Sequence, residues 1–244
     1  FLQRAYDPII HDVCLQNLPV TFCLDRAGLS PNDGPTHHGL FDLSYLSCIP
    51  NAIIMQPRNE DELQDMMKTG VKLSSPSFIR YPRGQGTGVE RKDSPDLIEI
   101  GKAEIILDGE LCAIWALGDF VSIACQISEQ IKSEFGVSLE VVNARFVKPL
   151  DGELLTLHGS KFKKIVTLED NVLKGGFGSS ILEYFELNEV SLPVKRIGWP
   201  DEFIPHGSST SELRAQFGLD TNSIHRTIVA FLQQELTNSR EMIV

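Results

Sequence analysis

The sequence predicts an α/β protein built on parallel sheets. Short apolar runs rich in β-branched and aromatic residues recur along the chain, helical patterns lie between them, and polar loops follow the runs. Repeated alternation of strand and helix is typical of parallel sheets covered by helices. In such sheets the loops at the carboxyl ends of the strands form the ligand crevice. Functional residues are therefore expected in those loops.

In the first half, Tyr6, Ile10, Val13 and Cys14 share one helical face. Strands are expected at 19–24, 52–55 and 77–81, because these runs are short, apolar and bounded by turn residues. The next helix is expected to begin after Asn59, whose side chain can accept from the N–H groups of the first turn.

In the second half, residues 84–96 are rich in Gly and charged residues and are expected to link two domains, 1–90 and 91–244. Asp119 is expected to cap a long amphipathic helix that stops at Gly136. The other expected elements are a small hairpin at 97–100 and 103–106, strands at 112–117, 139–143, 164–168 and 193–197, and helices at 151–158, 176–186, 210–217 and 221–236.

The composition excludes several classes of protein. The 244 residues carry a formal charge of -11, which argues against nucleic acid as the main partner. No apolar run approaches the roughly 20 residues of a membrane-spanning helix, and no secretory signal is present. The five cysteines are odd in number and irregularly spaced, so we expect them to be reduced and mostly to pack as small hydrophobic residues.

Three polar groups, Arg26, Asp33 and His37, follow the first strand within a dozen residues. A polar loop in this position is a candidate site. The alternative is a structural turn at 32–35, with His37 as a surface residue. Arg83 follows the third strand and is either a second anion ligand or a surface arginine. Strand alternation places Arg80 on the face opposite Arg83, so Arg80 is the weaker candidate.

Five segments carry a family resemblance, and together they extend over nearly the whole chain. They are Phe-Leu-Gln-Arg-Ala-Tyr-Asp at 1–7, Asp-Arg-Ala-Gly at 25–28 with Asp-Gly-Pro-Thr-His at 33–37, Arg-Tyr-Pro-Arg-Gly at 80–84, Ala-Arg-Phe-Val-Lys-Pro-Leu-Asp at 144–151, and Gly-Gly-Phe-Gly-Ser at 175–179. This combination resembles the 1-deoxy-D-xylulose-5-phosphate synthase family, thiamine-diphosphate enzymes of the transketolase superfamily.

The resemblance implies an incomplete parallel-sheet pyrimidine-binding domain followed by a transketolase C-terminal-like α/β domain. It implies condensation of pyruvate with glyceraldehyde 3-phosphate with loss of CO₂, for isoprenoid, thiamine and pyridoxal synthesis. By the same resemblance, His37 handles protons or stabilises charge over the cofactor, and Asp33 hydrogen-bonds a hydroxyl or the intermediate. Arg26 and Arg83 bind the phosphate, as guanidinium groups do in bidentate fashion.

Phe1 and Arg4 also match the family, in which the corresponding residues stack on the aminopyrimidine ring and line the active site. Pro8 departs from the expected pattern. Because proline is tolerated only in the first turn of a helix, the helix is expected to start or bend near Asp7, which would alter the placement of Arg4. The glycine cluster at 175–179 could cradle a phosphate, but close packing is the stronger interpretation.

Two parts expected of a thiamine-diphosphate enzyme are missing. No Gly-Asp-Gly metal motif occurs, and the family's catalytic glutamate lies upstream of Phe1. We therefore expect a fragment that is inactive alone, with the diphosphate and Mg²⁺ sites outside it. Alternatives are another transketolase-like enzyme, such as a ketol transferase or an oxo-acid dehydrogenase subunit, and a non-catalytic subunit or dimerisation module. A homodimer is expected, in bacterial cytoplasm or plastid stroma.

Overall fold

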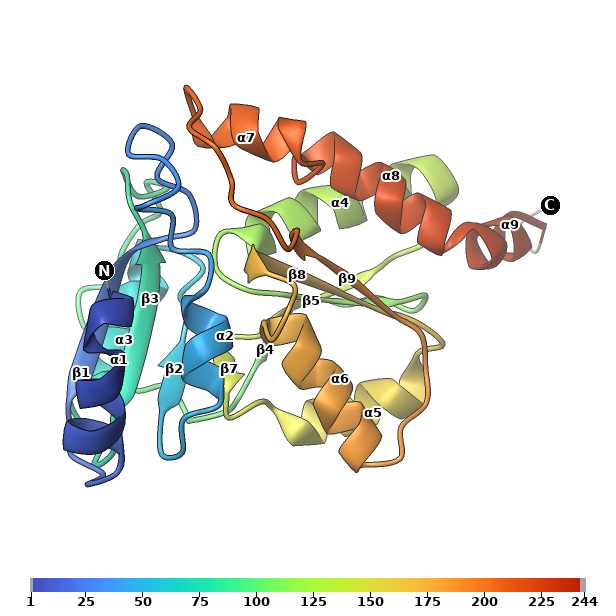
Figure 1. Cartoon of the computed structure of the whole chain (residues 1–244). Coiled ribbons are helices and arrows are strands. Elements are labelled where there is room, and N and C mark those ends of the chain that lie inside the picture. The colour runs from blue at the N-terminus through green and yellow to red at the C-terminus, as the bar shows by residue number, and fades with distance from the viewer. Residues whose placement is uncertain (1, 242–244) are drawn as a thin grey trace.

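The computed structural model describes residues 2–241, which form two β-sheets side by side (Figure 1). The first sheet has the strand order β1-β3-β2-β7 and the second β4-β6-β5-β8-β9. The strands are β1 Thr21–Ala27, β2 Ile53–Met55, β3 Ser77–Pro82, β4 Glu104–Leu107, β5 Ala113–Ala116, β6 Glu140–Asn143, β7 Phe146–Lys148, β8 Ile165–Val172 and β9 Val194–Trp199. Pairing is parallel except for the edge strands β7 and β4. The predicted α/β class is thus confirmed.

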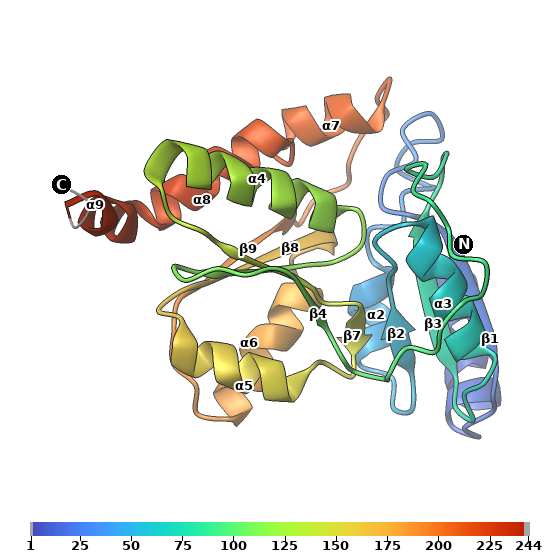
Figure 2. The ribbon, with the colours of Figure 1, turned by 180° about the vertical axis from the view of Figure 1, so that it is seen from behind.

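Helices cover both faces of the second sheet. In Figures 1 and 2, α4 and α8 lie on one face, and α5 and α6 lie on the other. The helical segments are η1 Leu2–Ala5, α1 Tyr6–Pro8, η2 Ile9–Cys14, α2 Asp42–Ser47, α3 Glu60–Gly70, α4 Phe120–Phe135, α5 Gly152–Lys161, α6 Phe177–Leu187, α7 Thr210–Gln216, α8 Thr221–Phe231 and α9 Gln233–Glu241. None of the helices within 2–241 is both long and apolar enough to cross a bilayer.

Several predicted helix boundaries are confirmed by the hydrogen bonds that cause them. The Asn59 side chain accepts from the N–H of Glu62 at 2.9 Å and caps α3. Asp151 does the same for α5, through the N–H of Leu154 at 3.0 Å. Gly136 ends α4 with φ 74°, a left-handed conformation that glycine adopts without steric cost.

Three predicted elements are wrong in detail. Asp119 does not cap α4, because its Oδ2 accepts from Arg214 Nη2 at 2.7 Å instead. Residues 97–100 do not form a strand of a hairpin: the N–H of Ile98 donates to Thr69 Oγ1 on α3, and the segment packs against that helix. The helix expected at 221–236 is divided at Leu232 into α8 and α9.

The N-terminal helix does not start near Asp7, which was one of the two expected alternatives, but its winding changes beside that residue. It starts at Leu2 rather than near Asp7, and Asp7 pairs with His11 at 3.0 Å instead of capping. Pro8 lacks an N–H group, so one backbone hydrogen bond is missing at that point. The winding changes there from 3₁₀ and α turns to a π-helix at Ile9–Cys14. The chain therefore accommodates Pro8 by changing its hydrogen-bond spacing within a helical segment.

The two sheets share a hydrophobic core. One cluster of buried side chains contains Ile54 and Phe78 from the first sheet together with Trp115 and Val142 from the second. In addition, β7, which lies late in the chain, pairs with β2 and completes the first sheet. The linker after β3 is fixed to α3, where Lys92 pairs with Asp65 at 2.8 Å. The relative position of the sheets is therefore set by packing as well as by the linker.

Gly28, just after β1, lies tightly against Asp170 of the second sheet. Its φ is +74°, and a Cβ there would lie 1.9 Å from Asp170 Oδ2. Gly88 has a similar φ of +80°, but a Cβ at this position would meet no atom within 4 Å. The two glycines thus share the backbone requirement and differ only in available space.

We predict that Gly28→Ala lowers the free energy of unfolding by roughly 2–5 kcal/mol, the sum of left-handed strain and overpacking. Gly88→Ala, the matched control, should lose only about 1–2 kcal/mol from strain alone. Urea unfolding of both variants measures the difference. Equal losses would show that the contact with Asp170 is not tight.

Candidate active site

A cavity of about 630 Å³ opens at the carboxyl end of β1. It is bounded by the N-terminal helix, the end of β1, the loop after it, α2 and one residue from the second sheet's loops. The lining residues are Leu2, Gln3, Ala5, Cys23, Leu24, Asp25, Arg26, Pro35, Thr36, His37, His38, Gly39, Phe41, Asp42, Tyr45 and Phe203. This is the position that a parallel sheet gives to its ligand crevice.

The loop after β1 is closed by its own backbone. The N–H of Gly28 donates to Gly39 O at 2.8 Å, and the N–H of Gly39 donates to Gly28 O at 2.7 Å. A Cβ on Gly39 would lie 2.3 Å from the carbonyl oxygen of Arg26, so only glycine fits there. Arg26 itself has φ 61°, an uncommon conformation for a residue with a side chain. The loop is thus held in one conformation, and residues 28–39 are called the site loop below.

Two of the predicted site residues line this cavity. Arg26 does so while its guanidinium pairs with the neighbouring Asp25. His37 does so with its Nδ1 at 2.9 Å from Thr36 Oγ1, a contact that orients the ring. A fixed cation and an imidazole therefore face the same space.

Asp33 and Arg83 lie beside the cavity and are not among its lining residues. Their side chains form an ion pair with each other, joining the site loop to the segment after β3. Of Arg26, Arg83 and His37, the structure thus brings Arg26 and His37 to the lining of one cavity.

The two N-terminal candidates are Phe1 and Arg4. Phe1 lies outside the described residues. Arg4 is exposed and does not line the cavity, although its neighbours Gln3 and Ala5 do.

His38 is a site-loop residue that sequence reasoning missed. It is buried, its Nδ1 accepts from the N–H of Ser30 at 2.9 Å, and its Nε2 donates to Pro205 O at 3.2 Å. Burial lowers the pKa of His38, which favours this neutral form. The side chain connects the site loop to a loop of the second sheet. Nothing in the sequence marks this contact, because His38 and Pro205 are 167 positions apart.

Arg80 is the other residue whose role was not predicted. Its side chain is 0% exposed, and its Nε donates to both oxygens of Asp42 at 3.0 and 2.8 Å. Nη1 donates to Gln56 Oε1 at 2.9 Å. Nη2 donates to the carbonyl oxygens of Gly39 at 2.6 Å and Asp170 at 2.7 Å. One guanidinium thus binds α2, the site loop and the second sheet.

Electrostatics keep Arg80 charged in this buried position. Burial alone would lower the pKa of Arg80, but the carboxylates of Asp42 and Asp170 outweigh it and raise the pKa. Asp170 is itself fixed by Trp199 Nε1 at 2.6 Å and by Arg214 Nη2 at 3.2 Å. The junction between the sheets is therefore a hydrogen-bonded ionic network.

The glycine cluster at 175–179 does not leave room for a phosphate. The Glu169 carboxylate already accepts from the N–H of Phe177 at 2.7 Å and of Gly178 at 2.9 Å, at the start of α6. Burial raises the pKa of Glu169 to about 8, although these two N–H groups act in the opposite direction. A Cβ on Gly176 would lie 2.1 Å from Glu169 Oε2, so the glycines serve close packing.

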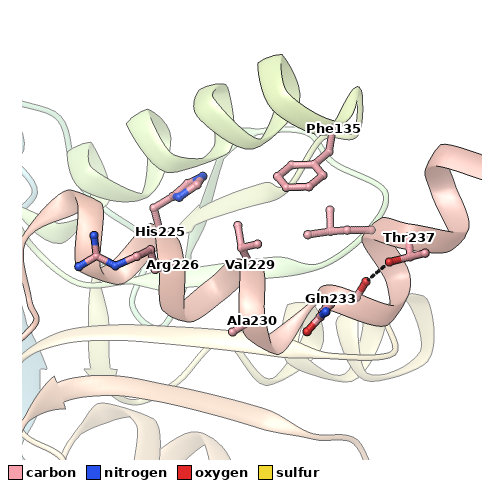
Figure 3. A pocket seen from close by; sticks show the side chains of 8 residues that line it. Phe135, His225, Arg226, Val229, Ala230, Gln233 and Thr237 are labelled. Carbon is pink, nitrogen blue, oxygen red and sulfur yellow. Dashed lines mark hydrogen bonds between the residues drawn. The ribbon is translucent and has the colours of Figure 1, made fainter.

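A second cavity, of about 540 Å³, lies between α4, α8 and α9, far along the second sheet (Figure 3). Apolar side chains such as Phe135, Val229 and Leu236 line much of it, and His225 pairs with Glu134 at 3.4 Å. Among residues 2–241 no group of three or more His, Cys, Asp or Glu side chains is arranged to hold a metal ion.

Comparison with known proteins places the chain in a family. Residues 1–87 match the family described as "Transketolase, pyrimidine binding domain", and residues 101–224 match "Transketolase, C-terminal domain". The chain belongs to the transketolase family. The first match contains β1, β2 and β3, and the second contains the whole second sheet together with β7, which completes the first sheet.

Within this family the chain is similar to 1-deoxy-D-xylulose-5-phosphate synthases, the group that its motifs resemble. It is 51% identical over 232 residues to the synthase of Acidobacterium capsulatum, covering 95% of this chain and 37% of that protein. It is 50% identical over 242 residues to that of Syntrophus aciditrophicus, covering 99% of this chain and 37% of that protein. The chain thus spans a little over a third of the length of these relatives.

Solved structures agree on the fold of this transketolase-family chain. A structure described as "Split gene transketolase, inactive beta4 tetramer" matches with a TM-score of 0.80 at 28% identity, covering 96% of this chain and 72% of that one. The transketolase of Campylobacter jejuni matches with a TM-score of 0.70 at 15% identity, covering 94% of this chain and 34% of that one, which shows the fold alone.

We predict that Arg80→Met lowers the free energy of unfolding by about 3–5 kcal/mol, because it leaves the Asp42 carboxylate buried without its partner. Arg91→Met, at an exposed position in the linker, is the control and should change stability by less than about 0.5 kcal/mol. Chemical denaturation followed by circular dichroism gives both values. A loss below about 1 kcal/mol at position 80 would contradict the role assigned to this network.

Proposed function

We propose that this chain is part of a thiamine-diphosphate-dependent synthase that condenses pyruvate with D-glyceraldehyde 3-phosphate to 1-deoxy-D-xylulose 5-phosphate, with loss of CO₂. The observation that carries the proposal is the cavity at the end of β1, which Arg26 and His37 both line. The identity of about 50% to synthases that carry this name supports the substrate assignment. The product would serve isoprenoid, thiamine and pyridoxal synthesis.

The cavity suits the two halves of such a reaction. Arg26 would bind the phosphate of the acceptor, since a guanidinium stays charged at any working pH and matches phosphate oxygens. His37 would hold or transfer a proton near neutral pH, and its contact with Thr36 fixes the ring for this task. Asp33 and Arg83, joined beside the cavity, would act on the same acceptor, Asp33 through a hydroxyl and Arg83 through the phosphate.

Thiamine diphosphate, when bound, supplies the carbanion chemistry. The residues of this chain fit the reacting side of that cofactor, because an imidazole and apolar groups such as Leu24 and Phe41 share the cavity. We propose that Phe1 packs on its aminopyrimidine ring and that Arg4 stays close to the site. We assign the diphosphate and Mg²⁺ to a part of the protein outside this chain, because the sequence has no Gly-Asp-Gly motif.

A second candidate function is a separate subunit that needs a partner chain for activity. The observation that favours it is the likeness to a solved structure described as an inactive tetramer of a split-gene transketolase. The two candidates differ in gene organisation. A single reading frame that carries the cofactor-binding region upstream of Phe1 favours the first, whereas a separate gene for that region favours the second. For the first candidate we propose a homodimer located in the bacterial cytoplasm or the plastid stroma.

The test is an assay of the complete protein with pyruvate, glyceraldehyde 3-phosphate, thiamine diphosphate and Mg²⁺. We predict product formation, and a fall in kcat of about 10²–10⁴-fold for His37→Asn, because a positioned acid–base group is lost. His11→Asn is the matched control, since His11 is exposed on the N-terminal helix and its side chain pairs with Asp7, away from the cavity lining. The 244-residue chain alone should release no CO₂.

Other outcomes separate the alternatives. Turnover with a ketose donor in place of pyruvate would indicate a ketol transferase. Unchanged kcat in the His37→Asn variant would remove the catalytic assignment of that residue.

A further inference from the structure

The loop between β9 and α7 brings one residue from the C-terminal part of the chain to the cavity. Phe203, in this loop, lines the cavity together with Arg26 and His37. Its ring meets the ring of Phe41 edge to face, with centroids 6.0 Å apart and planes at 77°. Among the described lining residues, Phe203 alone comes from beyond position 45. The wall that it forms is therefore a contribution of the C-terminal part of the chain.

The backbone on the C-terminal side of Phe203 is anchored to the site loop. Ile204 is buried in the core of the second sheet, and Pro205 O accepts from His38 Nε2 at 3.2 Å. Two residues further on, the N–H of Gly207 donates to Pro31 O at 3.4 Å. These contacts fix Phe203 relative to His37, which is the immediate neighbour of His38.

A close packing contact strengthens the same junction. Gly34 in the site loop has φ +74°, and a Cβ there would lie 2.2 Å from Nε2 of His206. The loop that carries Phe203 thus packs on the site loop through the imidazole of His206, which lies directly against Gly34. Contacts between the loop that carries Phe203 and the site loop therefore hold the phenyl ring at the cavity.

The ring of Phe203 is nevertheless 79% exposed. A phenyl group held in water at the edge of a cavity forgoes the burial that stabilises most such side chains. Two polar residues of the cavity, Arg26 and His37, suit a phosphate and a carbonyl. Phe203 and Phe41 offer an apolar surface to a carbon chain. Ligand pockets combine an apolar wall with a few placed polar groups in this way.

We propose that Phe203 determines which aldehyde acceptor the site takes, by limiting the length of the carbon chain between the aldehyde and its phosphate. This inference rests on the proposed function and adds to it a specificity role for the C-terminal part of the chain. By this proposal a longer acceptor phosphate meets the ring, whereas a three-carbon one does not. Replacing it with a methyl group enlarges the cavity at that wall.

The experiment compares kcat/KM of the complete protein for glyceraldehyde 3-phosphate and for D-erythrose 4-phosphate, which has one more carbon. In Phe203→Ala we expect the preference for the shorter acceptor to fall about tenfold, the lower end of what pocket shape gives for one carbon unit. The change should appear as a lower KM for the longer acceptor. Phe203→Tyr, which keeps the ring, should retain the original preference.

A matched control removes effects of surface hydrophobicity. Leu187, at the end of α6, is 78% exposed and does not line the cavity, so Leu187→Ala should leave both acceptors unaffected. Oxidation of pyruvate by ferricyanide, which needs no aldehyde, reports the donor half-reaction and should be equal in all variants. A thermal unfolding curve verifies that Phe203→Ala is folded.

The outcomes distinguish this inference from the function on which it rests. If Phe203→Ala consumes pyruvate normally and its acceptor preference stays within twofold of the unmodified protein, the role of Phe203 is overturned while the proposed function stands. If the unmodified protein consumes no pyruvate, the proposed function is overturned and the inference with it. A shifted preference in Phe203→Ala, restored in Phe203→Tyr, supports both.

Discussion

The buried guanidinium of Arg80 is the interaction on which the arrangement of the site depends. It binds Asp42 on α2, Gly39 of the site loop and Asp170 of the second sheet, and it is fully excluded from solvent. Transferring a cation out of water is costly, and a paired carboxylate with further hydrogen bonds in good geometry offsets this cost. The requirement ties three segments of the chain to one point. The geometry of the cavity at the end of the first sheet therefore depends on the position of the second sheet.

Close backbone approaches at the same junction follow from this constraint. Gly28 lies against the Asp170 carboxylate, and Gly34 lies against His206, so neither position has room for a Cβ. His38, neutral and buried, adds a hydrogen bond from the site loop to Pro205. The site is therefore a composite of two domains of the transketolase family. A loop so constrained can hold an imidazole in a fixed orientation, which is what positioned acid–base chemistry requires.

The sequence predicted the fold class and most elements, because β5 is a short apolar run that is buried throughout, and α4 keeps an amphipathic helical pattern that ends at Gly136. It failed where tertiary contacts decide the outcome. Asp119 was expected to cap a helix, but an ion pair with the distant Arg214 uses its carboxylate. The strand β7 pairs with a segment about 90 positions earlier, and no local pattern marks it. In the site, the loop motif located Arg26 and His37, whereas Arg80, His38 and Phe203 are defined by partners far away in sequence.

The most direct test of this account is native-state hydrogen exchange of the backbone amides of Gly28, Gly39 and Val172. The first two close the site loop, and the third donates to Leu40 O at 2.9 Å between that loop and the second sheet. If the Arg80 junction unites these segments, the three amides will exchange through one shared opening, with the same free energy and the same dependence on denaturant. If the two glycine amides exchange through a separate opening of low free energy while Val172 remains protected, the site loop is independent of the junction and the account is contradicted.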